Sequence, residues 1–431
     1  MMHRRAPTIL LVMISWCGLF VWFSSTRLNG YTPPKNDQQI GKGSGYGYVH
    51  LNLISSANTF SGVQIQTCTP DQLLLIQQQL PPHDCETNKR QPWTQQCSFS
   101  YATQCPDATW IEDFYHKKHK TKSNRNVTFT GMFVGCNKGM DAVNTLRMGS
   151  GNPSINKDEW KIAMTRGGKE TLGGSVCNQA NLPQFELHDH NVQRNNKTST
   201  SLSQVHCIEP MPSTYQALSQ SAKQLQWDAQ GLIVTHAAIS KSNGTIPFPS
   251  GKAGRENLGI ANCDGREADG VNCVNVDMFS LDTYVHKFVR HDGPIDFLSI
   301  DVEGFDVDVI LGGPSTLKRV HYLEFEYNWM GSWKNQKLSK TIRLLDETYN
   351  FTCYWPGYDG NIWRITDCWL DYYDLHFWSN VACVNRGVEQ MKDVAENMER
   401  LFLETLEKGI GLVMDVDHRG GNFQRAKTGD L

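Results

Sequence analysis

The chain has 431 residues, of which 39% are hydrophobic and 10% aromatic, and its formal net charge is -3. This length allows one large domain or two, and the apolar content is ample for a sizeable core. The nearly neutral charge balance gives no reason to expect a nucleic-acid-binding surface. We interpret the local basic run at residues 116–122 as a solvated loop.

The N-terminus has the pattern of a membrane-targeting signal. Arg4 and Arg5 precede an uncharged run over residues 8–23 that is rich in Ile, Leu, Val, Trp and Phe. As a helix this run spans roughly 24 Å at about 1.5 Å per residue, against ~30 Å for a hydrocarbon core. No clean small-x-small cleavage site follows it. We therefore predict a cytosolic tail (1–7) and an uncleaved signal anchor (8–23) with the bulk of the chain in the lumen, and a cleaved signal peptide is the alternative.

The 13 cysteines fit an oxidising lumen, because one lies inside the apolar run and an even number remains. Cys263 and Cys273 bracket a polar loop and could pair with each other. No C-x-x-C occurs and the His and Cys spacing matches no zinc site, so we predict no metal. Four cysteines crowd a region of weak periodicity, which indicates a disulfide-stapled segment: Cys68, Cys85, Cys97 and Cys105. The sequons, which permit a secretory location, are at Asn126, Asn196, Asn243 and Asn350.

Residues 24–122 read as a luminal stem, since the first part is rich in Gly, Ser, Asn and Pro and the second holds the clustered cysteines. A short helix is expected at residues 73–80. From Val127 onward, strand and helix patterns alternate, which is typical of a mostly parallel sheet with helices on both faces. Strands are expected at residues 128–134, 205–208, 232–239, 295–300, 320–325, 351–354 and 377–384. Helices are expected from Ala142, at residues 213–226 with Ser213 as cap, at 279–289, around 307–311 and at 340–349.

These patterns predict an α/β domain over residues 123–386. A polar, Gly- and Asn-rich insertion at residues 148–203 interrupts it, and we place that insertion over the site or on the surface. Residues 387–431 form a C-terminal helix and tail, because apolar residues recur there at helical spacing.

A glycine turn follows the first strand of the domain. Gly135 and Gly139 let the backbone turn tightly, and the next helix directs its N-terminal N–H groups at the same space. Glu209 ends the following strand, where an acid in a Rossmann-like layout binds ribose hydroxyls. The alternatives are a purely structural turn and a solvated loop acid.

Further acids follow two later strands. Asp301 and Glu303 come directly after the buried run at 295–300, which fixes them at the rim of a core. Glu324 and Glu326 share one face of the strand after that, because side chains alternate along a strand. Glu326 is therefore expected near the carboxyl edge of the sheet.

The chain resembles the FkbM family of S-adenosylmethionine-dependent methyltransferases from about Val127 to Arg386. The resemblance is carried by the ordered segments FVGCNKGMD, CIEPMPSTYQAL, AAIS, SLDTYV, IDFLSIDVEGFDVDVILGG, YLEFEYN and SNVACVNR. The D-V-E-G-F segment with its strand is the most specific part. The family implies a Rossmann-like class I methyltransferase fold and O-methylation of a hydroxyl, commonly on sugars or polyketide-like products.

Carried over by position, the resemblance assigns the turn residues Gly135, Asn137 and Gly139 to the methionine part of the cofactor. Family members usually have Asp-x-Gly-Ala-Asn in this motif. This chain has Phe133 and Cys136 at the Asp and Ala positions, which puts the cofactor contacts in doubt, and its interval from the turn to the next acid is longer than usual.

The resemblance likewise assigns Glu209 to the cofactor ribose and Asp301 to the cofactor site. Asp301 and Glu303 would line the place where the methyl group meets the acceptor, and Glu326 would be a further acid at that rim. The cofactor is already activated, so the protein mainly aligns the reactants, and a carboxylate can take the hydroxyl proton.

The expected function is O-methylation of a hydroxyl with S-adenosyl-L-methionine, on a glycan or secreted metabolite in the secretory pathway, with the Golgi membrane as the expected location. No nucleic-acid partner is expected. One alternative is a luminal type II glycosyltransferase, because Asp306-Val307-Asp308 spells a D-x-D, although we place it on a helix. The other alternative is an inactive methyltransferase-like module.

Overall fold

The computed structural model of the chain describes residues 67–79, 129–166, 203–255, 263, 272–289, 291–357, 360–376, 379–408, 414–417 and 422–425. The predicted tail, the predicted anchor, most of the predicted stem and much of the predicted insertion lie outside these residues. Within the described ranges, no helix is long and apolar enough to cross a membrane.

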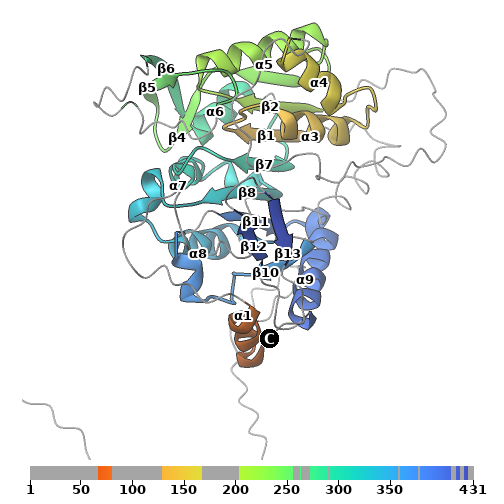
Figure 1. Cartoon of the computed structure of the whole chain (residues 1–431), viewed down its shortest axis with the longest axis vertical. Coiled ribbons are helices and arrows are strands. Elements are labelled where there is room, and N and C mark those ends of the chain that lie inside the picture. The colour runs from red at the N-terminus through yellow and green to blue at the C-terminus, as the bar shows by residue number, and fades with distance from the viewer. Residues whose placement is uncertain are drawn as a thin grey trace, which may run out of the picture. The chain divides into compact units, whose positions relative to one another are not determined.

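An eight-stranded sheet forms the centre of the domain, in the order β10-β9-β11-β8-β7-β1-β2-β3 (Figure 1). Its strands are β1 (Thr130–Val134), β2 (Gln204–Ile208), β3 (Leu232–Thr235), β7 (Phe297–Ile300), β8 (Tyr322–Tyr327), β9 (Phe351–Pro356), β10 (Ile362–Arg364) and β11 (Ser379–Asn385). Strands β3, β2, β1, β7 and β8 run parallel, and β11 runs antiparallel between β8 and β9. The sheet is thus mostly parallel, as the sequence predicts.

The order of the strands reverses between β1 and β7. The chain moves from β1 outward to β2 and β3, and later from β7 outward to β8 on the other side. At this point the ends of three strands are in register, since Val134 pairs with both Ile208 and Ile300. Open α/β sheets bind ligands at such a reversal, outside the carboxyl ends of the strands.

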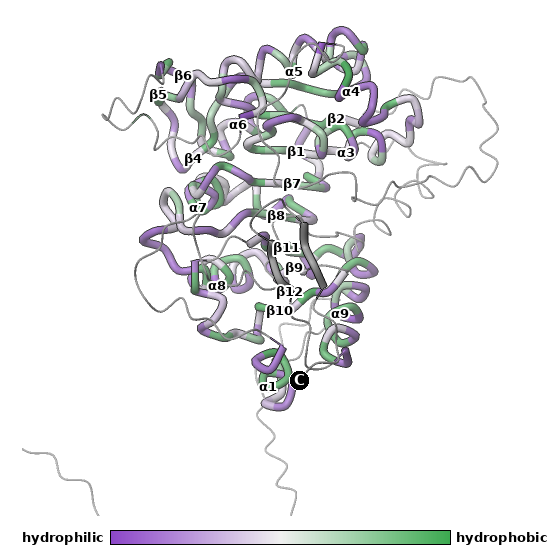
Figure 2. The backbone as a smooth tube through the Cα atoms, in the orientation of Figure 1, coloured by the Kyte–Doolittle hydropathy of each residue, from purple (hydrophilic) through white to green (hydrophobic). Residues whose placement is uncertain are grey.

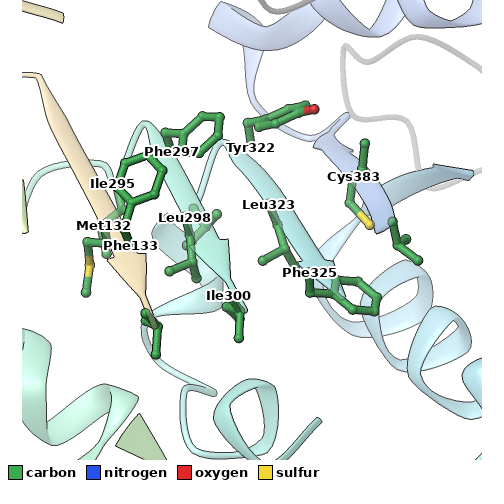
Figure 3. Close-up of a cluster of buried hydrophobic side chains, with 14 of the residues drawn as sticks. Met132, Phe133, Ile295, Phe297, Leu298, Ile300, Tyr322, Leu323, Phe325 and Cys383 are labelled. Atoms are coloured by element: carbon green, nitrogen blue, oxygen red, sulfur yellow. The ribbon is translucent and has the colours of Figure 1, made fainter. Parts of the chain in front are cut away.

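The parallel strands are mostly apolar and are buried on both faces. Every residue of β1 and β2 is buried, and β7 is buried except for Ser299. Figure 3 shows Phe297 and Tyr322 on one face of the sheet and Leu298, Leu323 and Phe325 on the other. Near-continuous hydrophobic runs of this kind are typical of a sheet with helices on both sides.

Helices cover both faces of the sheet, with α3 and α9 on one side and α7 and α8 on the other (Figure 1). Figure 2 shows that these helices alternate apolar and polar residues along their length. The helices are α1 (Pro70–Gln79), α3 (Met140–Ser150), α4 (Lys157–Met164), α5 (Pro212–Gln224), α6 (Leu281–Phe288), α7 (Asp306–Leu311), α8 (Leu338–Tyr349) and α9 (Lys392–Glu407). Short 3-10 helices are η3 (Leu317–Arg319), η4 (Gly331–Asn335), η6 (Asp371–Asp374) and η7 (Glu389–Met391).

Two small sheets accompany the central one. Strands β4 (Ala238–Ser240), β6 (Asn272–Ser280) and β5 (Gly244–Ser250) form the first, and β12 (Met414–Asp417) and β13 (Asn422–Arg425) form the second. The predicted pairing of Cys263 with Cys273 is confirmed, and this disulfide closes the connection between β5 and β6.

Residues 67–79, which the sequence analysis assigns to the stem, contact the C-terminal part of the domain. Cys68 forms a disulfide with Cys368 across a separation of 300 residues, so it does not staple a local segment. The Gln79 side chain donates to the Thr405 carbonyl oxygen at 2.8 Å and accepts from the Trp363 indole N–H at 3.0 Å. The start of the domain is therefore attached to α9 and β10.

Three local predictions were wrong. The predicted insertion begins with helix α4, whose Trp160 is buried and donates to the Lys138 carbonyl oxygen at 2.7 Å. The predicted strand at 232–239 is two strands, β3 and β4, because the chain leaves the central sheet after Thr235. Ser213 does not cap α5, since its hydroxyl donates to the Gly251 carbonyl oxygen instead.

Candidate functional site

A cleft lies at the carboxyl ends of β1, β2 and β7, where the strand order reverses. The space between its lining side chains is about 640 Å³, which includes the part that is open to solvent. The lining residues are Val134, Gly135, Asn137, Glu209, Pro210, Met211, Thr214, Ala237, Ala238, Ile239, Phe248, Arg255, Asp301, Val302 and Glu303.

Gly135 forms the tight turn at the end of β1. Its φ is 81°, and a Cβ at this position would lie 1.7 Å from the Asp301 carbonyl oxygen. The amide groups of Gly135 and Cys136 both donate to the Ile208 carbonyl oxygen at 3.0 Å. The turn is therefore packed against the end of β7 and bonded to the end of β2, and only glycine fits.

Asn137 continues the turn with a φ of 46°, a conformation that asparagine tolerates better than most residues. Its amide N–H donates to Glu209 Oε2 at 2.9 Å. Its side-chain oxygen Oδ1 is buried and has no hydrogen-bond partner. Because buried acceptors are nearly always paired, this oxygen is an exception in a residue that lines the cleft.

Glu209 lies at the end of β2 and is 6% exposed. Oε1 accepts from the Met211 amide at 2.8 Å and Oε2 from the Asn137 amide. Burial raises the pKa of this carboxyl to about 7. The two hydrogen bonds from backbone amides oppose this shift, and the nearby charge of Asp301 adds to it. Each carboxylate oxygen can accept a second hydrogen bond, so Glu209 can also bind ligand hydroxyls.

Asp301 and Glu303 lie on a sharp turn after β7. The Asp301 amide donates to the Val134 carbonyl oxygen at 2.9 Å, which extends the pairing of β7 with β1. Glu303 has a φ of 55° and Gly304 a φ of 93°, and a Cβ on Gly304 would lie 2.4 Å from the Met330 carbonyl carbon. This turn holds both carboxylates beside the glycine turn, and non-glycine residues with positive φ are enriched at functional sites.

Residues 180–352 match the methyltransferase FkbM domain. The match confirms the resemblance seen in the sequence, and the α/β fold with its mostly parallel sheet is consistent with a methyltransferase. The FkbM domain match includes Glu209, Asp301 and Glu303, and the glycine turn precedes it. Comparisons with curated proteins and with solved structures gave no match.

Two residues that the sequence analysis assigns to the site, Gly139 and Glu326, do not line the cleft. Gly139 starts helix α3 with a φ of 70°, and a Cβ there would lie 2.8 Å from Leu218. Glu326 is 5% exposed, and its Oε2 accepts from the Asn328 side chain at 2.7 Å. Gly139 therefore serves the packing of α3 against α5, and Glu326 lies beneath the rim rather than on it.

Glu324 and Phe133 belong to the sheet face that α3 covers. The Tyr322 hydroxyl donates to Glu324 Oε1 at 2.7 Å, and burial raises the Glu324 pKa to about 7. Phe133, which replaces the usual acid of the first motif, stacks on Phe297 with 5.4 Å between ring centroids. Neither side chain lines the cleft. The replacement of the usual Asp by Phe133 therefore does not change the residues that line it.

Asp306 is a buried acid that the sequence analysis treats only as part of a D-x-D. Burial raises its pKa well above the usual range, and the charge of Asp301 adds to this. Its Oδ1 accepts from the Glu326 amide at 3.3 Å. Asp308 accepts from the Ser332 hydroxyl at 2.5 Å and lies 3.5 Å from the Lys241 ammonium. Among the described residues, no group of three His, Cys, Asp or Glu side chains could hold a metal ion.

The sequence analysis missed the apolar wall of the cleft. Phe248 of β5 and Met211 both line it, and with Val276 of β6 they form a small buried cluster. The segment GTIPFPS of β5 carries two prolines and does not read as a strand, although prolines are tolerated at the edge of a sheet. The turn of β5 against β6 is thus what brings Phe248 to the cleft.

Proposed function

We propose that the chain is an S-adenosylmethionine-dependent O-methyltransferase that acts on a hydroxyl group. The observation that carries the proposal is the cleft at the carboxyl edge of the sheet, where Gly135, Asn137 and Glu209 converge in a chain that matches the FkbM domain. A methyltransferase match by itself leaves activity open, so the residues of the cleft must fit the cofactor.

The polar residues fit the two hydrophilic parts of the cofactor. The unpartnered Oδ1 of Asn137 suits the ammonium group of the methionine part, which is a donor. Glu209, bonded to two amides, suits the two ribose hydroxyls. The apolar side chains of Met211 and Phe248 suit a flat, weakly polar adenine ring. The ammonium group, the ribose hydroxyls and the adenine ring thus each have residues of matching chemistry in the cleft.

The bound cofactor supplies a methyl group that is already activated as part of a sulfonium. The residues of the chain have two tasks, which are to hold the acceptor hydroxyl beside that methyl group and to take the proton that leaves the hydroxyl. We propose that Asp301 or Glu303 takes the proton, since both line the cleft and stand on one rigid turn. Asp306 is buried nearby, and its carboxyl group interacts electrostatically with that of Asp301.

The role of the two acids is tested with Asp301→Asn and Glu303→Gln. If either residue is the base, its variant loses most of its turnover and keeps its affinity for S-adenosylhomocysteine. Unchanged turnover in both variants would exclude both residues as the base.

A secretory location, with the domain in the lumen, is the second part of the proposal. Every cysteine among the described residues forms a disulfide, in the pairs Cys68–Cys368, Cys136–Cys207, Cys263–Cys273 and Cys353–Cys383. Disulfides persist in oxidising compartments. The sequon residues Asn243 and Asn350 are exposed, as glycosylation requires. With the predicted N-terminal anchor, these features favour a type II membrane protein of the Golgi and a glycan acceptor.

A glycosyltransferase is a competing function, which is based on the D-x-D sequence motif. Its D-x-D lies on helix α7, with Asp306 buried and Asp308 bonded to Ser332, so neither carboxylate is presented for a metal-bound nucleotide sugar. An inactive module is the other competitor, and the altered first motif favours it.

One experiment separates the three functions. The purified chain is incubated with S-adenosylmethionine labelled in the methyl group and a panel of glycans, and calorimetry with S-adenosylhomocysteine is run in parallel. Binding and label transfer support the methyltransferase, and binding of a nucleotide sugar that depends on manganese would support the glycosyltransferase. An inactive module that has lost the cofactor would give no heat with either ligand.

A further inference from the structure

A disulfide joins two neighbouring segments that both contribute residues to the cleft. Cys136 lies between Gly135 and Asn137 in the glycine turn, and Cys207 lies in β2, two residues before Glu209. The two cysteines are 71 residues apart in the chain, and their Cα atoms are 5.2 Å apart. Neither cysteine lines the cleft, but the cross-link joins the glycine turn to the strand that carries Glu209, and Gly135, Asn137 and Glu209 all line it.

The conformation that the cross-link holds is a tight turn. Gly135 and Asn137, on either side of Cys136, both have positive φ values, 81° and 46°. Glycine adopts such values freely, but Asn137 does so at some cost in free energy, which the surrounding contacts offset. These contacts include two hydrogen bonds from backbone amides of the turn to the Ile208 carbonyl oxygen and one from the Asn137 amide to the Glu209 carboxylate. All of these bonds join the turn to the same strand end that the disulfide joins.

The disulfide is also connected to the position of Glu209, through the strand end and through the turn. Cys207 is buried on the sheet face that carries Phe133, its partner in the register of β1 and β2. Glu209 depends on the Asn137 amide for one of its two backbone bonds, so any movement of the turn away from β2 breaks that bond. The same movement would carry the unpartnered Oδ1 of Asn137 out of the cleft.

We propose that the Cys136–Cys207 disulfide is a positioning element for cofactor binding, which preorganises the glycine turn against Glu209. The inference rests on the proposed function, because it assumes that these two segments bind the cofactor. Preorganisation raises affinity by removing the cost of ordering the site at the moment of binding. Loss of the cross-link should therefore weaken cofactor binding beyond any effect on overall stability.

The competing explanation is that the disulfide only stabilises the fold. The Cys353–Cys383 disulfide is a matched control, because it also joins two neighbouring strands, β9 and β11, and no residue of these strands lines the cleft. Alanine is the usual family residue at position 136, so C136A introduces no steric fault. The variant C136A/C207V removes the cross-link and fills the buried space at Cys207, which separates the covalent link from side-chain packing.

The test compares the unmodified full chain with C136A/C207A, C136A/C207V and C353A/C383A. The dissociation constant for S-adenosylhomocysteine is measured by calorimetry and the melting temperature by scanning calorimetry. We expect both position-136 variants to bind about tenfold more weakly or worse, since ordering costs of this size follow from a loosened turn. The melting temperature of the control variant should fall by a similar amount, and its affinity should stay within about twofold of that of the unmodified chain.

Affinity within about twofold of the unmodified chain in C136A/C207A would overturn the inference. So would failure of both position-136 variants to fold, because the disulfide would then serve the stability of the whole domain. Absence of binding by the unmodified chain is a different result, since it refutes the proposed function itself.

Discussion

The two edges of the parallel sheet differ in how their polar groups are used. At the amino edge they bind one another: the Asp296 carboxylate accepts from the Thr130 amide at 2.8 Å and lies 3.4 Å from His321, and the Thr130 hydroxyl is 2.7 Å from His291 Nε2. At the carboxyl edge, Asn137 Oδ1 is buried without a partner and Gly135, Asn137, Glu303 and Gly304 all have positive φ values.

We interpret the amino edge as serving stability and the carboxyl edge as the one that binds the ligand. Bonded polar groups at the amino edge fasten the starts of β1, β7 and β8 to one another. Positive φ values at Asn137 and Glu303 and a buried acceptor without a partner cost free energy at the carboxyl edge. Substitutions at the two edges should therefore separate ligand affinity from stability.

The largest effect is expected for Gly135→Ala at the carboxyl edge. Its Cβ would lie 1.7 Å from the Asp301 carbonyl oxygen, so the turn must move away from β7. We expect the affinity for S-adenosylhomocysteine to fall by at least about a hundredfold, with some loss of stability. Calorimetric titration measures the first and thermal unfolding the second.

Gly387→Ala is the control for that variant, because a Cβ there meets no atom closer than 3.3 Å and the position does not line the cleft. Its affinity should stay unchanged. Equal affinities in the two alanine variants would contradict the role of the glycine turn.

The next effect is expected for Glu209→Gln, which replaces one carboxylate oxygen with a donor that faces a backbone N–H. Affinity should fall roughly thirtyfold, as for the loss of hydrogen bonds to a charged group. The pKa of about 7 adds a pH signature. The ribose hydroxyls donate hydrogen bonds to Glu209 and therefore bind its ionised form. Because less of that form is present at low pH, the unmodified chain should bind S-adenosylhomocysteine about tenfold more weakly at pH 6 than at pH 8.

Titrations of both proteins between these pH values check this expectation. Glu209→Gln should show little of the pH dependence, because an amide does not ionise in this range. A pH dependence that persists in the variant would assign the titration to another group.

A smaller effect is expected for Asn137→Gly. Glycine keeps the positive φ of 46° at no steric cost and deletes only the side chain with the unpartnered Oδ1. Loss of one hydrogen bond to the cofactor ammonium should weaken binding about tenfold. Unchanged affinity of this variant for S-adenosylhomocysteine would mean that the Asn137 oxygen does not face the ligand.

The smallest effect on binding is expected at the amino edge, for Thr130→Val. This change removes the hydroxyl beside His291 and keeps the shape of a buried side chain. The free energy of unfolding should fall by about 1 kcal/mol, the usual value for one buried hydrogen bond. Binding should not change, and weaker binding would show that the two edges are coupled.

The sequence allowed the parallel strands and the acids at their ends to be predicted because both depend on local pattern. Apolar runs such as Phe297–Ile300 form buried strands, and the acid that follows such a run must lie at the carboxyl edge. The glycine turn was found for the same reason, since Gly135 and Asn137 follow a buried strand directly.

Features that depend on distant parts of the chain could not be predicted. The pairing of Cys136 with Cys207 follows from the parallel register of β1 and β2, which brings together residues separated by 71 positions. The place of Phe248 in the cleft follows from an edge strand with two prolines. Glu326 was expected at the rim, but its strand ends under the turn that follows β7, where Asp306 bonds to its amide.

The most direct test of the account is a crystal structure of the chain soaked with S-adenosylhomocysteine. The account predicts the ribose hydroxyls on the Glu209 carboxylate and the amino group on Asn137 Oδ1, with the adenine ring against Met211 and Phe248. Ligand bound at another edge of the sheet, or a cleft that stays empty at saturating ligand, would contradict it.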